Sequence, residues 1–462
     1  MYVTRPLLQQ CMKAVEECLQ FKGPADGTLS YFFRNQPKLG QRDRGLIAET
    51  VYAVLRFKTR YMHLSESGVG NQLRRWVLLA LSELQAMPVD PNSLKELCTP
   101  TEYEWLRSLE AVDVATLPLA LQTNLPSWLL DLLVAQYGQE QTLALAAALN
   151  QAAPLDARVN TVKSSLEQVT QALDFAGIAY QVIPGVPDAL RLNGKPALHR
   201  VKAFTDGWFE VQDVGSQLLA HLVAPKRGEM VVDFCAGAGG KTLALGALMR
   251  NTGRLYAFDV SEGRLSKLKP RLARSGLSNV HPVRIDHEND AKIKRLAGKI
   301  DRVLVDAPCS GLGTLRRNPD LKWRQTPESV RELVAKQTSI LQSASRLVKA
   351  NGRLVYATCS LLQQENQHII EAFLSANPQW ELLPARDALQ AQKIDVPAAA
   401  GSPYLQLLPH QHDSDGFFAA VLVRKAGSAT ASADEVTTEA EDNVSTPSPE
   451  RVYKKAARKV AK

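Results

Sequence analysis

The chain has 462 residues, of which 45% are hydrophobic and 22% charged, as expected for a globular protein of two or three domains. It has no apolar run long enough to span a bilayer and no signal-peptide core at its start, which excludes a membrane protein and predicts a cytoplasmic location. The six cysteines form no C-x-x-C pair, so neither a disulfide framework nor a zinc site is predicted, and the net charge of +8 favours a polyanionic partner.

Residues 1–125 have the periodicity of α-helices and are expected to form a helical domain. Apolar residues recur every three or four positions in the stretches 7–19, 46–55 and 76–84, and three prolines (Pro88, Pro91 and Pro100) then break the pattern. Basic residues beside the second stretch fit either an RNA contact or a solvated helix face with ion pairs: Arg42, Arg44, Arg56, Lys58 and Arg60.

Residues 126–225 are expected to form a small α/β module. Helical spacing covers 128–137, 143–149 and 166–175, and strand-like runs cover 156–162 and 179–182. Because no catalytic arrangement of residues is visible in this segment, RNA binding is the role we expect for it.

Residues 226–426 alternate between strand and helix patterns. Strands are predicted at 230–234, 254–260, 280–285, 301–305, 352–356 and 417–423. Helices are predicted between them, including 264–275, which Pro270 is expected to kink or end early, and 329–348. The fold class predicted is therefore α/β, a doubly wound and mostly parallel sheet of the Rossmann-like kind. Residues 427–462 are rich in small and charged residues and are expected to be a disordered tail with a basic end.

The glycine-rich stretch from residue 231 to 242 reads VVDFCAGAGGKT and predicts a strand, a turn and a helix start. A dinucleotide fingerprint counted from Gly237 fails because Thr242 stands where the last glycine is needed. A phosphate-binding loop fits at its end, Gly240-Lys241-Thr242, but has Cys235 in place of its first glycine. On its own, the stretch fits phosphate and S-adenosylmethionine (SAM) equally well.

Ligands of doubly wound sheets bind beyond the carboxyl ends of the strands, so the residues at those ends are the candidate site. Asp259 is placed to bind two ribose hydroxyls, and Asp286 either reaches an adenine edge or caps a turn. Asp306 and Cys309 follow the fourth strand, and Cys359 follows the fifth. Each thiol alone is most simply a small buried residue, but both sit where a substrate would lie if SAM filled the glycine turn.

Three segments follow one another in the order CAGAGGKT, DAPCSGLGTLRRNPDLKW and YATCS. Together they resemble the RsmB-type (Fmu/Sun) family of RNA 5-methylcytosine methyltransferases. The similarity covers residues 126–424 and includes PLDARVN, GWFEVQD and DGFF.

The resemblance implies a SAM-dependent RNA cytosine-C5 methyltransferase in which Cys359 is the nucleophile and Cys309 assists its release. The residues implied to hold SAM are Cys235, Ala236, Gly237, Ala238, Gly239, Gly240, Lys241, Asp259, Asp286 and Asp306. Attack of a thiolate on C6 is needed because C5 of cytosine is a poor nucleophile, and Asp306, if protonated, would donate to N3. No metal is expected. RNA is the expected partner, with ribosomal RNA favoured and transfer RNA second, and the protein is expected to be a monomer.

A basic segment after the fourth strand adds a candidate RNA contact. It carries an aromatic residue, Trp323, that fits either base stacking or a core position. The basic residues around it are Arg316, Arg317, Lys322 and Arg324.

Two features depart from the family pattern. Ala238 stands where the family most often has proline, and only QRDRGLIAETVYAVLR and the helix around Trp76 resemble the antitermination-factor-like (NusB-like) domain of the family. The later helices of that domain have no evident counterpart between Pro88 and Leu125. Two other functions stay open, a P-loop nucleotide hydrolase and a non-catalytic RNA-binding assembly factor.

Overall fold

The structure, a computed structural model, describes residues 1–395 and 401–425. The predicted tail, residues 427–462, therefore lies outside the described residues. Nowhere in the described part of the chain is a helix long and apolar enough to cross a membrane.

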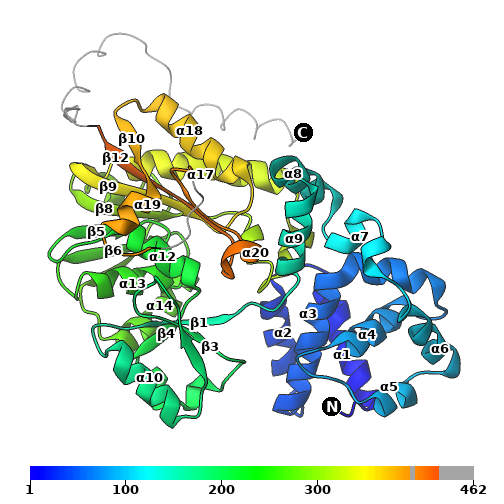
Figure 1. Cartoon of the computed structure of the whole chain (residues 1–462). Helices are drawn as coiled ribbons and strands as arrows, with labels where there is room; N and C mark the ends of the chain where they lie inside the picture. The colour runs from blue at the N-terminus through cyan, green and yellow to red at the C-terminus, as the bar shows by residue number, and fades with distance from the viewer. Residues whose placement is uncertain (396–400, 426–462) are drawn as a thin grey trace, which may run out of the picture. The chain divides into compact units, whose positions relative to one another are not determined.

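The N-terminal segment is helical, as predicted (Figure 1). Its helices are α1 (Arg5–Cys18), α2 (Ala25–Arg34), α3 (Gln41–Leu64), α4 (Gln72–Glu83), α5 (Pro91–Leu97), α6 (Pro100–Leu109) and α7 (Leu119–Thr123). The expected break after Pro88 is wrong in one respect, because Pro91 and Pro100 begin helices instead of interrupting them. Proline suits the first position of a helix, where its missing N–H has no partner to lose, and Asp90 and Thr99 cap these two helices. The NusB-like character of this domain stays a prediction.

The predicted α/β module is present as a four-stranded antiparallel sheet in the order β2-β3-β1-β4. Its strands are β1 (Leu155–Val159), β2 (Tyr180–Val182), β3 (Ala189–Leu192) and β4 (Phe209–Val211). The helices of this region are α8 (Ser127–Tyr137), α9 (Gln139–Leu149), α10 (Leu166–Phe175) and α11 (Lys202–Thr205). The module leads through α12 (Val214–Val223) into the large sheet.

The large sheet has eight strands, seven of them in the order β10-β12-β9-β8-β5-β6-β7, and β11 pairs with β12. The strands are β5 (Met230–Asp233), β6 (Arg254–Asp259), β7 (Val280–Arg284), β8 (Ile300–Asp306), β9 (Val348–Thr358), β10 (Trp380–Leu383), β11 (Leu405–Leu407) and β12 (Phe417–Arg424). Strands β5 to β9 run parallel to one another, whereas β12 is antiparallel to β9. Chain order reverses between β5 and β8, which is the switch point where a doubly wound sheet binds its ligand. All six predicted strands are confirmed.

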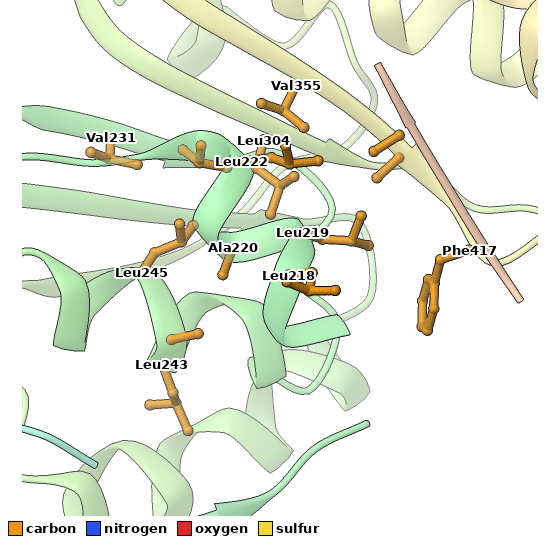
Figure 2. Close-up of a cluster of buried hydrophobic side chains, with 14 of the residues drawn as sticks. Leu218, Leu219, Ala220, Leu222, Val231, Leu243, Leu245, Leu304, Val355 and Phe417 are labelled. Atoms are coloured by element: carbon orange, nitrogen blue, oxygen red, sulfur yellow. The ribbon is translucent and has the colours of Figure 1, made fainter. Parts of the chain in front are cut away.

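Helices cover both faces of this sheet. Helix α12 packs on one of them. The helices that follow β5 along the chain are α13 (Gly240–Leu248), α14 (Glu262–Ser275), α15 (Ala291–Lys294), α16 (Leu321–Arg324), α17 (Pro327–Ser345), α18 (Gln367–Ala376), α19 (Ala385–Gln390) and α20 (Pro409–His412). Side chains alternate along each strand, so Val231, Leu304 and Val355 pack on one face while their neighbours pack on the other. Figure 2 shows the first face, where α12 and α13 bring leucines onto these three residues.

Helix α14 continues through Pro270, so the expected early end is wrong. Proline removes one backbone hydrogen bond within a helix, and contacts on both sides of it hold this one together. Leu265 and Leu268 before the proline are buried in the core, and Arg271 and Arg274 after it form ion pairs with the buried Glu210 of β4. Tertiary packing therefore outweighs the local cost.

Candidate active site

The glycine turn joins β5 to α13, and its two left-handed residues explain why it needs glycine. Gly237 has a φ of 57° and Gly239 a φ of 84°. A Cβ on Gly239 would lie 2.1 Å from Cδ1 of Leu268, which packs directly behind the turn. The Gly237 N–H donates to Asp259 Oδ2 at 2.8 Å, and Arg271 donates to the carbonyl of Ala238 at 2.8 Å. The turn is thereby held against β6 and α14 without the proline that the family usually has.

A cavity of about 390 Å³ lies beyond the carboxyl ends of the strands, beside the switch point. Ten predicted site residues line it: Cys235, Ala236, Gly237, Ala238, Gly240, Lys241, Asp259, Asp306, Cys309 and Cys359. Gly239 is not among its lining residues, because it turns toward Leu268. The cavity also has walls that the sequence did not single out, including Val260, Ile285, Glu288, Lys336 and Ile340. Their spacing within each element gives no sign that they face one cavity.

Asp286, like Gly239, is a predicted site residue that does not line the cavity. Its side chain is 72% exposed and pairs with Arg284, with Nη2 and Oδ1 3.3 Å apart. Ile285, one residue earlier, lines the cavity instead, because consecutive residues after a strand point in different directions. Glu288 is the nearest carboxylate of this loop that lines the cavity, and it accepts a hydrogen bond from Ser339 of α17.

The two predicted thiols meet in the cavity. The Sγ atoms of Cys309 and Cys359 lie 3.4 Å apart, and both residues are lining residues. The hydrogen bond to Cys359 and burial raise the pKa of the Cys309 thiol well above its usual value. Cys309 therefore keeps its proton and can donate it toward Cys359.

A buried carboxylate that no sequence pattern predicted lies behind the thiols. Glu365, in the turn η5 (Gln363–Glu365), is 0% exposed and accepts hydrogen bonds from the serines that follow both cysteines, Ser310 and Ser360. The partners are up to 55 residues apart in sequence, so no local pattern reveals them.

Asp306 forms an ion pair with Lys241, with Oδ2 and Nζ 2.7 Å apart. Burial disfavours the charge on Lys241, but the adjacent Asp306 carboxylate outweighs this effect and raises the pKa of Lys241. The ion pair therefore places the proton on Lys241. A second acid, Asp233, lies beneath the turn, where burial raises its pKa to about 7 although it accepts a hydrogen bond from Thr242.

The basic segment after β8 is not a free RNA surface. Lys322 is 2% exposed and donates to the carbonyl of Arg56, and burial lowers its pKa well below the usual value. The Trp323 Nε1 donates to the carbonyl of Leu55 at 2.7 Å, and its ring packs against the hydrophobic core of the helical domain. The arginines of the segment form ion pairs within the protein. Arg316 pairs with Asp413, Arg317 pairs with Asp213 and Asp415, and Arg324 pairs with Asp320.

Several basic residues of the helical domain, between Arg42 and Arg60, also have partners within the protein. Arg56 donates to the carbonyl of Arg316, Lys58 lies 4.6 Å from the centre of the Trp323 ring, and Arg60 pairs with Glu83. Arg56, Lys58 and Lys322 thus join the helical domain to the segment after β8. Arg44 donates to the carbonyl of Leu39 within the helical domain, and Arg42 stays a predicted RNA contact.

Strand order, the glycine turn and the position of the cavity define a Rossmann-like methyltransferase domain. The family model described as 16S rRNA methyltransferase RsmB/F matches residues 220–423, and the model of the ferredoxin-like domain of RsmF/B-like methyltransferases matches residues 125–199. The chain belongs to this RsmB/F family of small-subunit ribosomal RNA methyltransferases, and the family implies SAM as methyl donor. The resemblance predicted from the motifs is confirmed, and the P-loop alternative is not favoured.

Relatives cover more than four fifths of this chain. A probable ribosomal RNA small subunit methyltransferase B from Synechocystis sp. is 35% identical over 415 residues, covering 83% of this chain and 92% of that protein. Ribosomal RNA small subunit methyltransferase B from Klebsiella pneumoniae is 30% identical, covering 84% of this chain and 92% of that protein. Among solved structures, that of PH0851 has a TM-score of 0.75 and 26% identity, covering 92% of this chain and 100% of that one.

Proposed function

We propose that this protein methylates C5 of a cytosine in RNA, through a covalent adduct between Cys359 and C6 of the base. The observation that carries the proposal is the 3.4 Å separation of the Cys309 and Cys359 Sγ atoms in the cavity that the glycine turn lines. The reaction has two tasks for sulfur, since one atom must bond to C6 and another group must help to remove the C5 proton. A phosphate-transfer enzyme has no use for either thiol.

The chemistry of the cavity walls suits SAM. Val260, Ile285 and Ile340 offer an apolar surface for an adenine ring, Asp259 offers acceptors for ribose hydroxyls, and the glycine turn offers backbone groups for the amino-acid end. When bound, SAM supplies an electrophilic methyl group. The adenine-edge role of Asp286 stays a prediction, and in this structure its carboxylate lies with Arg284.

In the proposed reaction the Cys359 thiolate bonds to C6, and the electrons of the C5–C6 double bond move into the ring as N3 takes a proton. C5 becomes enamine-like and would take the methyl group from SAM, which would leave as S-adenosylhomocysteine when its S–CH₃ bond breaks. Removal of the C5 proton then forms the C5–C6 double bond as Cys359 leaves as a thiolate, and N3 gives back its proton.

The setting of Cys309 suits its role late in this sequence. The largest cause of its raised pKa is the hydrogen bond to Cys359. Once the Cys359 sulfur is bonded to C6, it is no longer a free thiol or thiolate that holds the Cys309 proton in this hydrogen bond. In the proposed role, Cys309 gives up its own proton to solvent and then removes the C5 proton as a thiolate.

The ion pair changes the role proposed for Asp306. As a carboxylate, Asp306 can accept a hydrogen bond from the exocyclic amino group of cytosine but cannot donate to N3. Lys241 is the member of the pair that carries the proton, so we propose that protonation of N3 draws on Lys241.

Small-subunit ribosomal RNA is the substrate we propose, because the relatives that span the chain are named for it, and transfer RNA is the second candidate. The cytosine must be single-stranded or flipped out, because its C5 and C6 atoms are unreachable inside a stack. We assign RNA binding to residues 1–125 and 126–225 and catalysis to residues 226–426. That the protein acts as a cytoplasmic monomer stays a prediction.

Incubating the purified protein with ribosomal RNA and methyl-labelled SAM, followed by nucleoside analysis, tests the proposal. We expect the label in 5-methylcytidine, and label in any other nucleoside would refute the proposed chemistry. Thermal unfolding distinguishes a SAM-dependent enzyme from a nucleotide hydrolase. SAM at about 100 times its Kd should stabilise the protein by about 2.7 kcal/mol, whereas stabilisation by ATP alone would favour a nucleotide hydrolase.

A further inference from the structure

The two cysteines of the site share a buried anchor. Ser310 follows Cys309 and donates both its backbone N–H and its hydroxyl to Glu365, at 2.8 Å to Oε1 and 2.5 Å to Oε2. Ser360 follows Cys359 and donates its hydroxyl to the same Oε2. The two hydroxyl oxygens lie 3.1 Å apart, so the turns after β8 and β9 meet on one carboxylate.

Glu365 is itself fixed on several sides. Gln337 of α17 donates to its Oε1 at 2.9 Å, and Tyr356 of β9 donates to its backbone carbonyl at 2.7 Å. The next residue, Asn366, donates to the carbonyl of Ser360 at 3.0 Å. The carboxylate is completely buried and does not line the SAM cavity. It therefore acts on the site only through the residues that it holds.

Every group around this carboxylate is a donor toward it: one backbone N–H, two hydroxyls and one amide N–H. A carboxylate has acceptors for all of them, whereas an amide of the same shape turns an NH₂ group toward donors. The position therefore demands a carboxylate and not merely a polar side chain of this size.

We propose that Glu365 is a positioning residue that sets the distance between the two reactive thiols by holding both Cys-Ser turns on one carboxylate. The inference rests on the proposed use of the two thiols in methyl transfer. The negative charge of Glu365 also helps to keep the proton on Cys309. It contributes to the raised pKa of that thiol, although less than the hydrogen bond to Cys359 and burial do.

Three variants test the proposal by methyl-transfer kinetics. Glu365→Gln is expected to lower kcat about 100-fold, because a misplacement of about 1 Å has an effect of this size. KM for RNA and Kd for SAM should stay within about twofold, since Glu365 touches neither binding surface. Glu365→Asp, which keeps the acceptors, should recover part of kcat. Glu371→Gln, the same change of charge on the exposed side of α18, should leave kcat unchanged.

A second measurement reads the thiol spacing without any methyl transfer. Phenylarsine oxide bonds to two neighbouring thiols with loss of one water, so its capture by the native protein reports whether Cys309 and Cys359 are held together. Capture should be at least tenfold slower in Glu365→Gln than in the wild type, and Cys309→Ser should abolish it. Where Glu365→Gln does not fold, the double variant Ser310→Ala/Ser360→Ala removes both hydroxyl contacts without adding a donor, and it should slow capture and lower kcat together.

Wild-type kcat and wild-type capture in Glu365→Gln, or in the serine double variant, would overturn the proposal. A lower kcat with unchanged capture would overturn it as well, because the thiol spacing would then not be what Glu365 controls. Rapid capture by a wild-type protein that forms no 5-methylcytidine would refute the proposed function and leave the anchoring by Glu365 in place.

Discussion

Trp323 gives the sharpest distinction between an RNA contact and a structural contact. The structure places its indole against the helical domain, with Nε1 2.7 Å from the carbonyl oxygen of Leu55 and the Lys58 ammonium 4.6 Å from the ring centre. Trp323→Ala should therefore destabilise the protein without lowering its intrinsic affinity for RNA.

The magnitude follows from three contributions. The hydrogen bond contributes about 1 kcal/mol and the cation–π contact about 0.5–1 kcal/mol. The half-buried ring covers roughly 100 Å² of apolar area, which at about 25 cal/mol per Å² adds about 2.5 kcal/mol. The free energy of unfolding should fall by about 4 kcal/mol in Trp323→Ala, and by about 1–2 kcal/mol in Trp323→Phe, which keeps most of the ring packing but loses the N–H donor.

Urea denaturation measures the stability of the two variants, and fluorescence anisotropy with a ribosomal RNA fragment measures their affinity at a temperature where both are folded. Wild-type stability in Trp323→Ala, together with a loss of tenfold or more in RNA affinity, would refute the structural role of this side chain. That result would restore the base-stacking role that the sequence left open.

Two further predictions concern the glycine turn and the acid beneath it. Gly239→Ala should lower the free energy of unfolding by about 2–4 kcal/mol and weaken SAM binding, because the new Cβ would lie 2.1 Å from Leu268 and the φ of Gly239 is 84°. Gly237→Ala, whose Cβ would have no atom within 4 Å, should lower it by only about 1–2 kcal/mol. Equal urea midpoints for the two variants would contradict this difference. Burial raises the pKa of Asp233 to about 7, above the value of about 3.9 in an unfolded chain. Between pH 4 and pH 7 the folded state therefore binds a proton that the unfolded state has lost. The free energy of unfolding falls as the pH rises through this range. Asp233→Asn removes this pH dependence of stability. In urea titrations the stability of Asp233→Asn relative to wild type should rise from pH 5 to pH 8, by up to about 1.4 kcal/mol per pH unit. A difference in stability that does not change with pH would be evidence against a buried acid at this position.

The sequence predicted the large sheet well because its information is local. A strand buried on both faces is a short apolar run, and the residues at its carboxyl end are known as soon as the strand is placed. This is why the glycine turn, Asp259, Asp306 and both cysteines were found and why ten of the predicted residues line one cavity.

The features that the sequence did not predict depend on contacts between distant segments. Helix α14 runs through Pro270 because Glu210, 60 residues earlier, anchors Arg271. The sequence around Lys322 and Trp323 is typical of a basic RNA-binding segment, but in the structure both side chains contact the helical domain. Glu365 has an unremarkable sequence context, and its importance lies in the two turns that it joins.

The covalent adduct is the central claim, and denaturing gel electrophoresis of the Cys309→Ala and Cys359→Ala variants after incubation with RNA and SAM tests it most directly. We predict that Cys309→Ala forms a protein–RNA adduct that survives denaturation, because the bond to C6 forms but the C5 proton is not removed, and that Cys359→Ala forms neither adduct nor 5-methylcytidine. An adduct formed by Cys359→Ala, or methylation that persists without Cys359, would contradict the assignment of the two thiols.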